Sequence, residues 1–139
     1  MNKVFEQPLV KLTFRQAVED AKRAIREKGW TFIYDKKKDG SCQNFDSEGA
    51  PSCVVGHILS YEGMKLEDIT DVVEPTFNEN MDLNHLGIHT MRSRGAVQVS
   101  DEALRFLNEL QILQDHGETW GHSYTAALRK VYRVRKFYV

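Results

Sequence analysis

Few cysteines, almost no net charge and no long apolar run characterise this sequence. No run approaches the roughly 20 apolar residues that a membrane-spanning helix requires. The opening residues, MNKVFEQP, lack the apolar core of a signal peptide. We therefore expect a cytoplasmic protein, in which the two cysteines are reduced thiols rather than a disulfide. The formal net charge of −1 argues against a general binder of polyanions.

The chain does hold enough apolar residues to build a core. Hydrophobic residues make up 41% of its 139 positions and charged residues 28%, proportions that suit a globular domain. Neither an internal repeat nor a low-complexity linker divides the sequence. We expect one globular domain over residues 1–139, with loose termini at 1–12 and 136–139.

The first half of the sequence predicts a helix followed by a hairpin. Thr13 and Gln16 have the spacing of a capping box, and Gly29 is placed to end the helix that they begin. The aromatic and β-branched run at 30–34 is typical of a strand, and a charged D-G loop leads to a returning strand. We therefore predict an α+β fold, a mainly helical single domain with one β-hairpin at 30–46 packed on the helices.

The rest of the sequence predicts further helices. They are expected over 53–62, 65–73, 82–91 and 101–116, and from 120 into the C-terminal tail, with a loop at 76–82 and a short extended piece at 97–99. Ser52, Ser100 and Thr119 are the expected N-caps.

Both cysteines lie in the segment 41–59, and they raise the question of a metal site. Cys53 and His57 stand four residues apart, so a helix places them on one face, and Cys42 lies across the connecting turn. Zinc accepts such Cys and His ligands. The fourth ligand is open among His85, His89, His116 and His122, with His89 the first choice. Because no C-x2-C pair is present, the spacing is poor support for zinc, and we expect no cofactor.

Two other interpretations of Cys53 remain. A thiol at a helix N-terminus can be a nucleophile, and His89, His116 or His122 would then be its base, as in a Cys-His hydrolase. No motif surrounds these histidines. We favour a buried thiol in the core, with His57 tethering the hairpin and Gly56 allowing the hairpin to approach closely.

Charge is unevenly distributed, which points to a partner. Residues 62–82 hold seven acids and one lysine, whereas residues 129–139 hold five basic residues and no acid. The expected partner-binding residues are Glu67, Asp68, Asp71, Glu74, Phe77, Arg133, Arg135 and Lys136. Because the tail interleaves basic and aromatic residues, nucleic-acid binding is an alternative to a protein partner.

Two short motifs carry a resemblance to a known group. The first, the Cys53 box, is G-x-P-x-C-x-x-G-H-x-L over residues 49–59; the second, the Gln114 box, is Q-x-x-Q-D-x-G-x-x-W over residues 111–120. In both, and in the aromatic segment before them, the chain resembles small proteins encoded by bacteriophages of actinobacteria, over roughly residues 14–130. The resemblance implies a phage source and a shape, but no catalytic mechanism.

The Gln114 box also has a physical interpretation of its own. Gly117 can end one helix, Trp120 can pack back over the turn, and Asp115 or Gln111 can bind the exposed amides of the next helix. These are roles in a scaffold.

The sequence therefore favours binding over catalysis. We expect a small phage-encoded accessory protein that binds and modulates a host protein during infection, in the cytoplasm of the host. The alternatives are a module stabilised by zinc, one that binds nucleic acid through the basic tail, or a Cys-His hydrolase.

Overall fold

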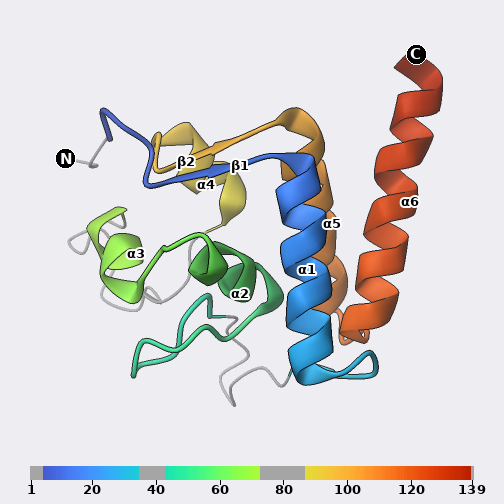
Figure 1. Cartoon of the computed structure of the whole chain (residues 1–139), viewed down its shortest axis with the longest axis horizontal. Coiled ribbons are helices and arrows are strands. Elements are labelled where there is room, and N and C mark those ends of the chain that lie inside the picture. Colours follow the sequence, from blue (N-terminus) through green and yellow to red (C-terminus); the bar gives the residue numbers. More distant parts are fainter. Residues whose placement is uncertain (1–4, 35–42, 73–86, 139) are drawn as a thin grey trace.

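The computed structural model describes residues 5–34, 43–72 and 87–138, with side chains at all of these except 70–72 and 136–138 (Figure 1). The elements follow in the order β1 (Val10–Leu12), α1 (Phe14–Lys28), α2 (Val54–Tyr61), α3 (Leu66–Val72), α4 (Ile88–Ser93), β2 (Val97–Val99), α5 (Asp101–Asp115) and α6 (Trp120–Tyr138). The predicted α+β class, mainly helical with a small sheet, is confirmed. The predicted hairpin tip, the 76–82 loop and the start of the helix at 82 lie outside the described residues.

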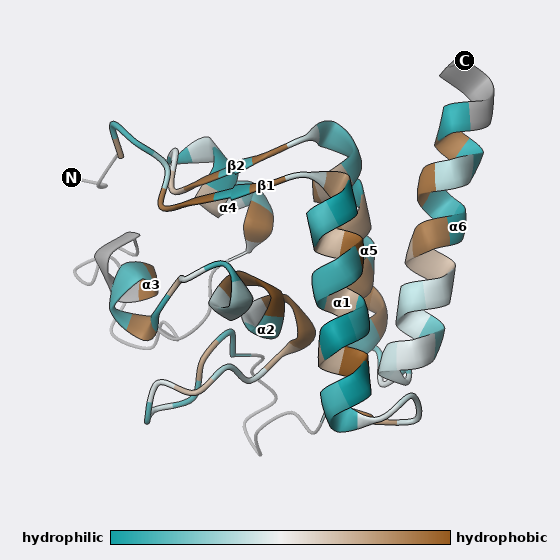
Figure 2. Cartoon of the chain, in the orientation of Figure 1, coloured by the Kyte–Doolittle hydropathy of each residue, from teal (hydrophilic) through white to brown (hydrophobic). Residues whose placement is uncertain are grey.

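The long helices stand side by side (Figure 1). α5 packs along α6, α1 lies against α5, and α2 contacts both α1 and α5. α2 is hydrophobic over much of its length (Figure 2), and residues 54–59 are all buried. The sheet and α4 lie beyond the end of α2, next to the start of α1 (Figure 1).

The sheet is not the predicted hairpin. β1 and β2 pair in parallel, with Val10 opposite Val97 and Leu12 opposite Val99. The valines and Leu12 point into the core, while the residues between them are exposed. β2 coincides with the extended piece expected at 97–99, whereas β1 lies within the N-terminal stretch that we expected to be loose.

The aromatic segment after α1 has a different role from the predicted strand. The amide of Trp120 donates to the Phe32 carbonyl at 2.9 Å, and the amide of Gly121 donates to the Trp30 carbonyl at 3.0 Å. The first amides of a helix have no partner within the helix. The carbonyls of Trp30 and Phe32 therefore bind the start of α6, and these two carbonyls are not available to pair with a second strand of a hairpin.

A short antiparallel ribbon does form, but farther along the chain than predicted. The amides of Ser52 and Cys53 donate to the carbonyls of Asn44 and Gln43 at 2.8 and 2.9 Å. The turn of this ribbon is closed by the Asp46 carboxylate, which accepts from the amides of Glu48 and Ala50. The ribbon delivers the chain directly into α2.

The helix caps are mostly as predicted. Thr13 and Gln16 form both bonds of the capping box, and the cap amide of Gly29, at φ 107°, donates to the Ile25 carbonyl. Ser100 caps α5, and the Thr119 hydroxyl accepts from the third amide of α6. The prediction for α2 is wrong by one residue, because its N-cap is Cys53 rather than Ser52.

The C-terminal tail is part of a helix. α6 continues through the basic residues to Tyr138. The sequence predicts an apolar stripe on this helix; four of its residues are buried and Leu128 is half-buried, the four being Trp120, Tyr124, Ala127 and Val131. Within the described part of the chain, no helix is long and apolar enough to cross a membrane.

Candidate functional site

The two sequence boxes meet in the core, although some fifty residues separate them in the sequence. The side-chain oxygen of Gln114, on α5, accepts from the Val54 amide at 2.8 Å and from the Trp120 indole N–H at 3.1 Å. Gln114 and Trp120 are almost fully buried, at 1% and 0% exposure. One amide oxygen thus joins the start of α2, the end of α5 and the start of α6.

We predicted that a side chain of the Gln114 box binds the N-terminus of a helix. That role exists, but the residue and the helix differ from those we predicted. We expected Asp115 or Gln111 to bind the first amides of α6. Those amides are bound by the segment at 30–32 and by Thr119 instead. It is Gln114 that binds a helix N-terminus, and the helix is α2.

Cys53 is held inside the core by contacts on several sides. Its sulfur accepts from the Gly56 amide at 3.4 Å and from the Asn44 amide group at 3.6 Å, and its S–H donates to Gln111 Oε1 at 3.4 Å. The side chain has 0% exposure. The sulfur therefore acts as the N-cap of α2, a role that serine or threonine normally takes.

His57 is bound to its own helix rather than to the ribbon. Its Nδ1 lies 2.9 Å from the Cys53 carbonyl oxygen, which can only accept, so this nitrogen carries the proton. The ring packs edge-on against Trp120 at 5.2 Å between centroids. Burial lowers the pKa of His57 below its usual 6.5, so the imidazole is neutral at pH 7.

Gly56 allows the predicted close approach. A Cβ at this position would lie 1.9 Å from the carbonyl oxygen of Asn44, so the chain of the ribbon touches the helix backbone here. Packing around the start of α2 therefore accounts for the spacing of Cys53, Gly56 and His57 within this box.

The candidate zinc ligands are dispersed where they are described. Cys53 and His57 are buried, whereas His89 is exposed on α4. Cys42 and His85 lie outside the described residues. Among residues 5–34, 43–72 and 87–138, no three His, Cys, Asp or Glu side chains are grouped as metal ligands.

The hydrolase arrangement lacks an accessible nucleophile. His89, His116 and His122 are all exposed, and His122 lies 3.8 Å from the Glu118 carboxylate. Cys53 has no exposed surface. A substrate carbonyl must approach a nucleophile to about 3 Å, and in this conformation the core residues around Cys53 prevent that approach.

The buried state of Cys53 leads to a prediction for alkylation. In a Cys42→Ser variant, Cys53 should react with iodoacetamide about a hundredfold or more slowly in the folded protein than in urea, since an opening that costs about 3 kcal/mol lowers the reactive population by this factor. Mass spectrometry of the tryptic peptide gives the rate. Rapid reaction of the folded protein at neutral pH would instead indicate an exposed, activated thiol.

The expected partner-binding residues of the acidic segment differ in exposure, and several of them are not described by the structure. On α3, Glu67 is exposed, while the Asp68 carboxylate accepts from the Lys65 amide at 2.8 Å. Glu74 and Phe77 lie outside the described residues, and the side chains of Asp71 and Lys136 are not among those described.

The basic tail is partly neutralised by α5. Arg135 forms a two-pronged ion pair with Glu102, and Lys130 binds Glu109 at 2.7 Å. Arg133 is exposed. Fewer basic side chains of the tail are therefore free to bind phosphate groups than the sequence predicts.

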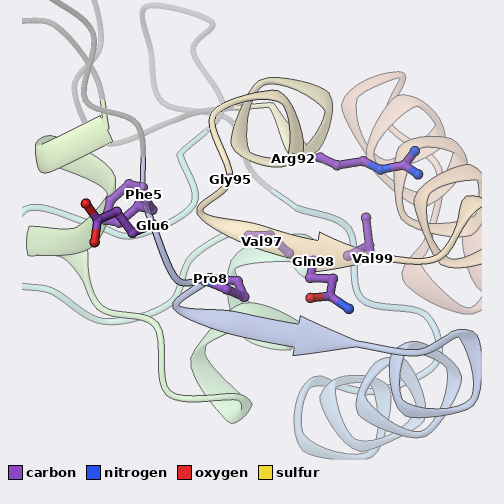
Figure 3. Close-up of a pocket in the computed structure, with 8 residues that line it drawn as sticks. All are labelled: Phe5, Glu6, Pro8, Arg92, Gly95, Val97, Gln98 and Val99. Atoms are coloured by element: carbon purple, nitrogen blue, oxygen red, sulfur yellow. The ribbon is translucent and has the colours of Figure 1, made fainter.

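A shallow depression of about 370 Å³ lies beside β2 (Figure 3). Its lining residues are Phe5, Glu6, Pro8, Arg92, Gly95, Val97, Gln98 and Val99. Phe5 and Glu6 lie toward one end of the strand and the Arg92 guanidinium toward the other (Figure 3), where it binds Asp101 at 2.7 Å. Glu6 and Arg92 are the charged residues of this lining.

An exposed apolar surface was missed in the sequence. Trp30 is 56% exposed and Ile33 is 53% exposed, the largest values among the big apolar side chains described. The sequence contains a signal for it, since this is the most aromatic run in the chain, but that run predicts a strand packed on the helices. We call these two side chains the Trp30 surface.

Comparison with known proteins returns no assignment: no family model matches the chain, and no significant match occurs among curated proteins or solved structures.

Proposed function

We propose that this protein acts by binding a protein partner through the Trp30 surface, without catalysis. The observation that carries the proposal is that Trp30 and Ile33 are each more than half exposed although the segment that bears them is tightly held. Apolar surface that is both exposed and rigid is typical of a binding site.

The rigidity comes from α6. The carbonyls of Trp30 and Phe32 bind the first amides of that helix, and Ile33 forms an antiparallel bridge with Thr119. The Trp30 ring lies over Gly121, where a Cβ would come within 2.4 Å of it, and meets the Tyr124 ring edge-on at 6.2 Å. Because this segment is already ordered, little of its conformational entropy is lost when a partner binds to it.

Tryptophan is also the residue most enriched at the energetic centres of protein interfaces. A ring with one side on its own protein and the other side in water presents a flat apolar surface to a partner pocket. This supports a protein partner over a nucleic acid, because Arg135 and Lys130 are already paired within the chain.

The partner that we propose is a host protein bound in the host cytoplasm during phage infection. The support for a phage source is the resemblance carried by the Cys53 box and the Gln114 box. Both boxes are used in the core, where Cys53 and Gln114 are buried. They account for a common scaffold, so recognition of a particular host protein falls to surface residues outside them.

The proposal predicts that a charge on the Trp30 surface disrupts binding. Affinity capture from infected host cells would first identify the partner, and its affinity would then be measured with the purified protein. Ile33→Arg should weaken binding by about tenfold or more, because the charge replaces apolar contact at the interface.

A matched control is available at the other end of α1. Leu9 directly precedes β1, before the start of α1, and is 41% exposed, so Leu9→Arg should leave the affinity unchanged. Equal binding of wild type and Ile33→Arg, with both folded by circular dichroism, would refute the Trp30 surface as the contact. A partner whose affinity depends on Arg133 instead would favour the basic tail.

A further inference from the structure

A buried carboxyl oxygen at the junction of α1 and α2 has no hydrogen-bond donor among the described residues. Asp20, midway along α1, is half-buried, and its Oδ2 atom is buried with no partner among the described residues. The group that faces it is the carboxyl of Glu62, the C-cap residue of α2. Two ionised carboxylates in contact repel each other, and neither has a proton to donate.

The charged groups around Asp20 do not remove this conflict. Glu62 faces it from the end of α2, and Glu19 and Arg23 lie near it on α1. Arg23 is the only cation among them, and it is engaged elsewhere: its Nε lies 3.4 Å from Glu27 Oε1, and its guanidinium lies 4.0 Å above the Tyr61 ring.

Tyr61 is the remaining titratable group of α2 at this junction. Its hydroxyl donates to Glu27 Oε2 at 2.7 Å, so its proton is directed away from Asp20. Burial and the bond to Glu27 raise the pKa of Tyr61 above its usual 10, which keeps it neutral throughout the physiological range.

A single proton shared by the two acids satisfies the buried oxygen. A protonated carboxyl donates one O–H bond to an ionised partner, and such bonds are short and strong. In agreement with this arrangement, burial and the neighbouring Glu62 raise the pKa of Asp20 from 3.8 to about 7.

We propose that Asp20 and Glu62 share one proton near neutral pH, and that this acid pair is a pH-sensitive clasp between α1 and the end of α2. When the proton leaves, the two carboxylates repel and the clasp opens. Glu62 lies at the start of the connection from α2 to α3, so opening loosens the attachment of α3 to the body of the protein.

The effect on stability has a definite sign. Between about pH 4, where an unfolded aspartate loses its proton, and about pH 7, the folded protein holds one proton more than the unfolded chain. Stability contributed by the clasp is therefore fully present below about pH 4 and is lost as pH rises to 7. His57 acts in the opposite direction, since its lowered pKa makes acid unfavourable for the folded state below about pH 6.5.

Because the two effects oppose each other, the test compares variants at each pH. Asp20→Asn keeps the shape of the side chain and provides a donor to Glu62 at every pH, while His57 is unchanged. Relative to this variant, the unfolding constant of wild type in urea should rise with pH between 4 and 7, by up to about tenfold per pH unit for one proton. Glu62→Gln should give the same pH-dependent difference. In hydrogen exchange, the protection of the α3 amides relative to the intrinsic rate at each pH should be lower in wild type at pH 8 than at pH 5.

The control is Glu48→Gln, which removes an exposed carboxylate from the turn of the ribbon, away from the pair. Its difference from wild type should not vary with pH between 4 and 8. A flat difference for both Asp20→Asn and Glu62→Gln would overturn the clasp. So would restoration of wild-type stability at pH 8 by added Mg²⁺ or Ca²⁺, because the pair would then be neutralised by a cation rather than by a proton.

Discussion

Replacing Gly56 with alanine is expected to prevent the chain from folding stably. The new Cβ would lie 1.9 Å from the carbonyl oxygen of Asn44 and 2.7 Å from its carbonyl carbon. Neither atom can move freely, because the same oxygen accepts the Ser52 amide at 2.8 Å. Overpacking of a well-packed core costs about 1–3 kcal/mol. We expect about 3 kcal/mol or more here, because the clash is between two main chains.

Urea unfolding followed by circular dichroism measures this loss, and two other glycines provide controls. Gly87→Ala adds a Cβ that has no described atom within 4 Å, at a φ of −66°, so it should cost about 1 kcal/mol or less. A Cβ at Gly121 would lie 2.4 Å from the Trp30 ring, so Gly121→Ala displaces a side chain rather than a main chain and should lie between the two. Wild-type stability of Gly56→Ala would contradict the close approach of the ribbon to α2.

The features that could be predicted from the sequence are those set by neighbouring residues. The capping box of Thr13 and Gln16, the cap at Ser100 and the apolar stripe of α6 depend on spacings within one or two helical turns. Such local signals suffice to give the mainly helical class and most helix positions. At Cys53 the local signal misled us, because a serine precedes a cysteine that takes over its role.

The sheet could not be predicted in the same way. β1 and β2 have only three residues each and lie more than eighty residues apart in the sequence. A strand of that length has no periodicity to detect, and parallel pairing depends on everything folded between the two strands. The aromatic run at 30–34 had the stronger strand signal, but its carbonyls bind the start of α6.

In the candidate site, too, the sequence predicts the features that depend on neighbouring residues but not the contacts between distant segments. That Cys53 is a core thiol and that the Gln114 box belongs to the scaffold followed from composition and turn chemistry. That the two boxes contact each other did not, since no local pattern links Gln114 to the amide of Val54, sixty residues away. The Trp30 surface was missed for a related reason, because exposure is a property of the whole fold.

Replacing Gln114 with methionine is expected to destabilise the fold strongly without adding bulk. Methionine has a similar shape, but it leaves the Val54 amide and the Trp120 indole N–H without their acceptor in a site with 1% exposure. Each unsatisfied buried donor costs about 1–3 kcal/mol, so the loss should be about 2–6 kcal/mol. Urea unfolding gives the total, and faster hydrogen exchange of the Trp120 indole N–H reports the broken bond directly.

Gln111→Met separates this effect from the general cost of a methionine on α5. Gln111 lies one turn earlier; its Oε1 accepts the weak S–H donor of Cys53 at 3.4 Å, and its Nε2 donates to Asp115 at 2.9 Å. We expect about 1 kcal/mol from this variant, and an unchanged exchange rate at Trp120. If both methionine variants cost the same and neither alters the indole, then Gln114 is not the group that joins α2, α5 and α6, and the two boxes must be held together by apolar packing around Trp120.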